Sequence, residues 1–227
     1  MKHIQNILAL LLLSFPLPSL GQNPPQYVLF FSAGAPITYF QNTLQIPTSH
    51  QSPNLIAIWS GLQPASNAFV YQTVIEGLNG AWWNAPQVCC TPQEYYGPNI
   101  QLLPGDSLKS VFELRSDGQV TDTWEYSSSG QENPFSGSAV LDPHKYQDGA
   151  DLINALFSIE PQTPYSEWDF GNVLFKDIVI TAQTTSTAWC TPKFGRGGFT
   201  VTYTKPVHSV SEGTSTCSFG QIELVKT

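Results

Sequence analysis

The chain has 227 residues, of which 17 are acidic and only nine are Lys or Arg, so its formal charge is −8. Nucleic acids and anionic membranes attract clustered basic residues, and this composition therefore argues against both as partners. The length suits one domain, and apolar and aromatic residues are frequent enough to bury a substantial core.

The N-terminal segment predicts export. Lys2 precedes the apolar run Ile7–Leu13, and small residues follow up to Gly21, as a signal peptidase requires. The apolar run is shorter than the roughly 20 residues that a membrane span needs. We therefore expect a signal peptide over 1–21 and a secreted, monomeric protein with one domain over 22–227.

Four cysteines in an exported protein are expected to pair. Cys89 and Cys90 are neighbours, and because a bond between neighbours is strained, each is expected to pair elsewhere. Cys190 and Cys217 flank a hairpin-like stretch and could close it. Three connectivities are possible, and the sequence does not choose among them. No Cys-x-x-Cys or His-x-x-x-His spacing occurs, so we expect neither a metal nor another cofactor.

Short runs of β-branched and aromatic residues, bounded by turn residues, recur along the chain. They cover 27–32, 37–46, 55–60, 69–75, 100–103, 108–115, 119–126, 152–160, 172–183, 199–204 and 219–225. Between 133 and 151 the pattern dissolves into Pro, Gly, Ser and Asp, which predicts a long surface loop that could overhang a cleft. Roughly a dozen short strands predict an all-β sandwich or jelly roll.

Two polar residues interrupt the apolar strands. Gln72 lies within one strand, and Glu160 ends another. Most polar residues in strands are satisfied locally or by solvent, so the residues alone favour a structural role, with a cleft-facing role as the alternative. Trp82 and Trp83 would face opposite sides of an extended strand, one in the core and the other free to line a groove.

Several well-known hydrolytic motifs are absent. The sequence has no Gly-x-Ser-x-Gly, no Asp-Thr/Ser-Gly and no His-Glu-x-x-His. A glycosidase needs two carboxylates across a groove, and Glu113, Glu125 and Glu160 could supply them, but the sequence does not pair them.

A series of short motifs, taken in order, resembles the glutamic peptidase (eqolisin) family. The motifs are Ile46-Pro47, Ala57-Ile58-Trp59-Ser60-Gly61, Val70-Tyr71-Gln72-Thr73, Pro104-Gly105-Asp106-Ser107-Leu108, Ser129-Gly130-Gln131 and Asn154-Ala155-Leu156-Phe157-Ser158-Ile159-Glu160. Each motif is short, but their order and spacing together are more specific than any one.

The resemblance implies a concanavalin A-like jelly-roll sandwich of two antiparallel sheets and an endopeptidase that acts on polypeptides at acidic pH. The family's catalytic glutamine falls on Gln72 and its glutamate on Glu160. Glu160 would then act as general base on a water molecule, while the Gln72 amide would hold that water and stabilise the oxyanion.

The resemblance also implies a substrate-binding set. Trp59 matches a tryptophan beside the dyad, and Trp82 matches one on the substrate side. Glu76, Trp83 and Asn84 complete the expected set. Glu76 stands where the family has an aspartate, and Asn84 where it has an acidic residue.

The same scaffold could instead be a non-catalytic carbohydrate-binding (lectin-like) or wall-associated protein. Its partner would then be a glycan, stacked on the rings of Trp59, Trp82, Trp83 and Trp124.

Overall fold

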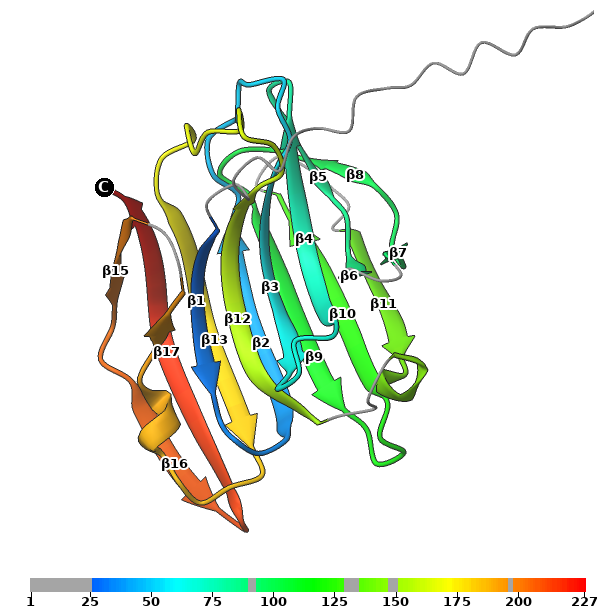
Figure 1. Ribbon diagram of the computed structural model, residues 1–227, viewed down its shortest axis with the longest axis vertical. Coiled ribbons are helices and arrows are strands. Elements are labelled where there is room, and N and C mark those ends of the chain that lie inside the picture. The colour runs from blue at the N-terminus through cyan, green and yellow to red at the C-terminus, as the bar shows by residue number, and fades with distance from the viewer. Residues whose placement is uncertain (1–25, 90–92, 129–134, 147–150, 196–197) are drawn as a thin grey trace, which may run out of the picture.

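The computed structural model describes residues 26–89, 93–128, 135–146, 151–195 and 198–227. Within these ranges the chain forms two antiparallel sheets and two short 3-10 turns, η1 (Pro143–Lys145) and η2 (Ala188–Cys190). The predicted all-β sandwich is confirmed (Figure 1). The expected signal peptide and Cys90 lie outside the described residues.

Sheet A has nine strands and contains most of the residues expected at the site. In spatial order these are β14 (Lys193–Phe194), β1 (Tyr27–Ser32), β12 (Leu152–Pro161), β3 (Ile56–Pro64), β4 (Val70–Leu78), β5 (Ala81–Asn84) and β8 (Ile100–Leu102), with β6 (Gln87–Cys89) beside β4 and β7 (Glu94–Tyr95) beside β6.

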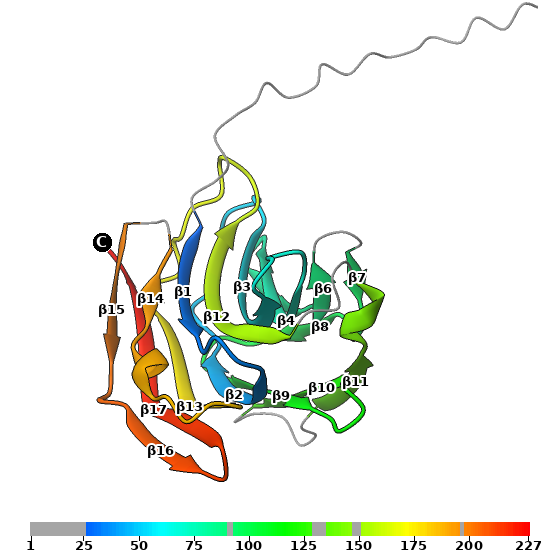
Figure 2. The same cartoon turned by 60° about the horizontal axis from the view of Figure 1, so that its bottom comes forward.

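Sheet B has eight strands. In spatial order these are β11 (Phe135–Leu141), β10 (Val120–Ser127), β9 (Ser107–Leu114), β2 (Ile37–Gln45), β13 (Val173–Ala182), β17 (Thr214–Lys226) and β15 (Phe199–Tyr203), with β16 (Val207–Ser211) beside β17. Figure 2 shows the two sheets as layers, with β12 and β3 in one layer and β2 and β9 in the other.

The main core lies between the sheets and is built by alternate residues of their strands. Ile58, Tyr71 and Phe157 of sheet A are fully buried in it. Phe157 packs edge-on against Phe40 of β2, with ring centroids 5.4 Å apart. Because successive side chains of a strand point to opposite faces, the residues between these lie on the outer face of sheet A.

Two expectations need correction. The segment predicted as a long loop contains strand β11, because its small residues pair with β10 from Val120↔Leu141 to Tyr126↔Phe135. Cys190 and Cys217 are buried free thiols. The Cys217 thiol donates a weak hydrogen bond to the carbonyl oxygen of Cys190 at 3.9 Å. Cys89 is disulfide-bonded.

Within the described ranges, no helix is long and apolar enough to cross a membrane.

A carboxyl group, Asp122 of β10, is fully buried between the sheets. Its Oδ2 lies 2.7 Å from Tyr96 Oη, and Thr73 Oγ1 lies 3.3 Å from both of its oxygens. Tyr96 Oη is also 3.2 Å from the carbonyl oxygen of Gln72. The Tyr96 hydroxyl has one proton for two acceptors, so both bonds form together only when Asp122 is protonated and donates to Tyr96. Burial accordingly raises the pKa of Asp122 to about 7.

We therefore expect the fold to be more stable in acid. The folded protein holds the Asp122 proton more tightly than the unfolded chain, whose pKa is near 3.8. The Asp122 proton therefore stabilises the fold fully below about pH 4, and this stabilisation is lost as the pH rises through about 7. The change is on the order of 4 kcal/mol in the free energy of unfolding. Asp122→Asn can still donate to Tyr96 and should flatten this dependence in urea denaturation at pH 4 and pH 7. An equally steep dependence in the variant would contradict the assignment.

Candidate active site

Trp59, Gln72 and Glu160 share the outer face of sheet A. They lie on β3, β4 and β12, three adjacent strands whose other faces pack into the core. The outer face has a small apolar cluster of its own. That cluster consists of Ala57, Trp59, Val70, Val74 and Leu156. The three central strands of sheet A are therefore buried on one face and largely covered on the other.

Glu160 is held at both carboxyl oxygens by neutral donors. Trp59 Nε1 donates to Oε2 at 3.1 Å, and Gln26 Nε2 donates to Oε1 at 2.5 Å. These bonds orient the carboxylate and leave it half-buried beside the Trp59 ring. Neither donor carries a charge.

Gln72 is buried on the same face, with 4% of its surface exposed. Its Oε1 atom has no hydrogen-bond partner among the described residues, and neither does Ser158 Oγ on β12. Unpaired polar atoms also occur in the core, as at Tyr71 Oη and Asn84 Nδ2, and a bound water would supply the missing partner at such buried positions. Ser158 is also visible in the sequence, as a polar residue inside an apolar run.

The strand register separates Gln72 from Glu160. Gln72 lies opposite Gly61, and Gly61 lies opposite Leu156, so the residue in line with Gln72 on β12 is apolar. Glu160 lies four residues further along that strand. With strand spacings of about 4.8 Å and a rise of about 3.3 Å per residue, the two Cα atoms are roughly 16 Å apart. The expectation that one water molecule bridges both side chains does not fit this register.

Glu76 is the carboxyl group in line with Glu160. Both are paired with Ala57, from opposite sides, so Glu76, Ala57 and Glu160 form one row across β4, β3 and β12. Tyr95 Oη donates to Glu76 Oε1 at 3.1 Å. Burial raises the pKa of Glu76, and the Tyr95 hydrogen bond partly opposes that rise. Tyr95 belongs to a loop-like segment and gave no sequence signal.

The alternation along β5 separates the remaining expected residues. Trp83 pairs with Glu76 and shares its face. Trp82 is fully buried in the core, where its Nε1 donates to the Thr48 carbonyl at 3.1 Å. Asn84 is also fully buried and pairs with the core residue Ile75. Trp82 and Asn84 therefore face the interior, and the expectation that they bind substrate is wrong for both.

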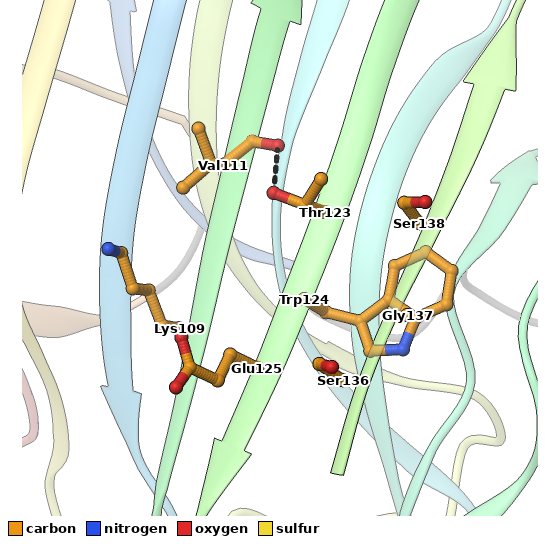
Figure 3. A pocket seen from close by; sticks show the side chains of 8 residues that line it. All are labelled: Lys109, Val111, Thr123, Trp124, Glu125, Ser136, Gly137 and Ser138. Carbon is orange, nitrogen blue, oxygen red and sulfur yellow. Dashed lines mark hydrogen bonds between the residues drawn. The ribbon is translucent and has the colours of Figure 1, made fainter. Parts of the chain in front are cut away.

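A polar depression of about 470 Å³ lies on the outward face of sheet B, away from this site (Figure 3). It is lined by Lys109, Val111, Thr123, Trp124, Glu125, Ser136, Gly137 and Ser138. Trp124 is only 2% exposed there, because its ring packs inward over Gly137. Neither Trp82 nor Trp124 therefore offers a ring face for stacking on a sugar.

No group of three or more His, Cys, Asp or Glu side chains in the described part of the chain could hold a metal ion.

No family model matches the sequence, and no curated protein matches it. The fold, a sandwich of two antiparallel sheets, is similar to that of solved glutamic peptidases. A structure of scytalido-glutamic peptidase with a peptide-based transition-state analogue aligns at a TM-score of 0.54 and 18% identity, over 87% of this chain and 98% of that one. SCP-B, an eqolisin in complex with the tripeptide Ala-Ile-His, aligns at a TM-score of 0.51 over the same shares and with the same identity. The chain therefore has the fold of these peptidases.

The neighbouring tryptophans offer a matched test of the two faces of β5. Trp82→Ala should lower the free energy of unfolding by about 3–5 kcal/mol, because it empties a core position. Trp83→Ala removes a half-buried ring from the outer face and should cost much less, since part of that ring already contacts solvent. Urea denaturation of both variants measures the difference. Equal losses would show that Trp83 is a core residue as well.

Proposed function

We propose that this protein is an exported hydrolase that cleaves polypeptides at acidic pH on the outer face of sheet A. The observation that carries the proposal is Glu160, a half-buried carboxyl group that Trp59 and Gln26 orient at the edge of the apolar cluster on this face. The peptide ligands named for the two similar structures support a polypeptide substrate.

Glu160 acts as general base in this proposal. It accepts a proton from a water molecule, and the resulting hydroxide attacks the carbonyl carbon of the scissile bond. A carboxylate is a base only while it is ionised, so the activity has a lower pH limit where Glu160 becomes protonated. The Trp59 and Gln26 donors fix the direction in which the second lone pairs of the carboxylate point.

Gln72 binds the substrate away from the bond that is cut. An extended peptide rises about 3.3 Å per residue, so a chain lying over β3 and running along it from the row of Glu160 reaches the row of Gln72 after about four residues. Halfway along, it passes the row in which Trp59 pairs with Ser158. The unpaired oxygens of Ser158 and Gln72 are both buried, so backbone N–H groups of the peptide would bond to them only where the side chains that cover them move aside.

The purified protein should cleave an unfolded protein substrate between about pH 2 and 5, and Glu160→Gln should lower kcat/KM by about 10²–10⁴ because it removes the general base. Glu125→Gln, an exposed carboxyl on sheet B, is the matched control and should keep full activity. Appearance of new amino termini measures cleavage. Equal activity of the wild type and the Glu160 variant would refute the proposal, and so would glycan binding without any peptide cleavage.

Gln72→Leu separates substrate binding from chemistry. The variant loses a hydrogen-bonding group about four residues from the cut, so KM should rise for substrates that extend that far and stay unchanged for shorter ones. The measurement is KM for a nested series of peptides truncated from one end. A large fall in kcat for every peptide would instead place Gln72 at the reacting bond.

A further inference from the structure

We propose that Glu76 is the second catalytic residue of this site, a general acid that protonates the leaving amine while Glu160 activates the water. This inference rests on the proposed function. It gives Glu76 a chemical role in place of the substrate-binding role that the sequence suggested.

The first support is the row that Glu76 shares with Glu160. Ala57 is the residue between them, and both carboxyl groups project from the same face of the sheet. Two strand spacings place their Cα atoms about 10 Å apart. Inverting glycosidases, which hold a water and a scissile bond between two carboxyl groups, separate those groups by roughly 6.5–9.5 Å, and two glutamate side chains on these strands can close to that distance. Gln72, in contrast, has Leu156 in line with it, which cannot move a proton.

The second support is the small residue between the two acids. Ala57 has the shortest side chain with a Cβ, so nothing of its own rises between Glu76 and Glu160. Trp59 follows two residues later on the same face, and its indole holds Glu160 from the side. Ala57 is 5% exposed and packs in the same apolar cluster as Trp59, so a peptide bond bound between the two acids lies against the Trp59 ring, with one carboxyl group on each flank.

The surroundings of Glu76 favour its protonated form, which a general acid requires. Glu76 accepts a hydrogen bond from Tyr95 of β7, and it is flanked by Trp83 of β5. Burial raises its pKa, so it keeps its proton at a higher pH than an exposed glutamate. Its hydrogen-bond partner Tyr95 and Glu160 in the same row are both titratable, and neither is a cation that would favour ionisation of Glu76.

The reaction balances with one water molecule. Glu160 takes a proton from water, and the hydroxide forms a bond to the carbonyl carbon. The C–N bond then breaks as the Glu76 carboxyl gives its proton to the nitrogen, which leaves as an amine. Glu160 returns its proton to solvent and Glu76 regains one. The net change is one peptide bond and one water converted to an acid and an amine.

The leaving group provides the decisive experiment. Glu76→Gln should lower kcat/KM about 10²–10⁴-fold on a peptide amide, whose nitrogen must be protonated to leave. On a 4-nitrophenyl ester with the same acyl part, whose leaving group needs no proton, the loss should stay within a few fold. Glu113→Gln, an exposed carboxyl of sheet B, is the control and should leave both rates unchanged.

The results separate the two proposals. An equal loss on amide and ester, or no loss on either, would overturn the role of Glu76 while leaving Glu160 in place. Unaltered cleavage by Glu160→Gln would overturn the proposed function itself.

The pH profile gives a second test, through Tyr95. In this mechanism the upper pH limit of amide cleavage reports ionisation of Glu76. Tyr95→Phe removes a hydrogen bond that favours the ionised form, so the upper limit should move to higher pH while the lower limit stays. Tyr95 is 57% exposed, and its loss should therefore leave the fold intact. An unchanged upper limit would contradict the role assigned to Glu76.

Discussion

The strict alternation of side chains along β3, β4 and β12 is the constraint on which the rest of this structure depends. Each strand must supply apolar residues to the core on one face, as Ile58 and Phe157 do, and present Trp59 and Glu160 on the other. A shift of one residue would put Glu160 into the core and Phe157 on the surface. The energy of core packing therefore also fixes the face on which the polar residues appear.

The buried polar groups tie this face to the opposite sheet. Asp122 comes from β10 of sheet B, and Tyr96, its partner, also bonds to the backbone of Gln72 in sheet A. Thr73 adds a second link, since its hydroxyl contacts both Asp122 and Ser110 of β9. The position of β4 is thus linked to the protonation of one buried carboxyl group. A protein that works in acid would gain from this link, because the protonated group completes the set of hydrogen bonds.

The sequence predicted the class of fold and the face of the site, but not the register. The period-two pattern indicated that Gln72 interrupts one apolar strand and Glu160 ends another, and both share one face with Trp59. β12 pairs with β3 across about 90 residues of chain and has an irregularity between Leu152 and Asn154. No local signal sets such a pairing. The same limit explains Trp82, since alternation shows that one of two tryptophans is buried without saying which.

The register matters more than the presence of the two residues. Moving the pairing register of β12 by two or four residues keeps every side chain on the same face of the sheet. The alternation of apolar and polar residues therefore fits a register with Glu160 beside Gln72 as well as one with Glu160 beside Glu76. The observed pairing chooses the second and puts Leu156 in line with Gln72. Acid–base chemistry needs groups that exchange protons, and Gln72 and Leu156 do not. The mechanism that we propose therefore uses the row of Glu76 and Glu160, with Gln72 holding the chain that is being cut.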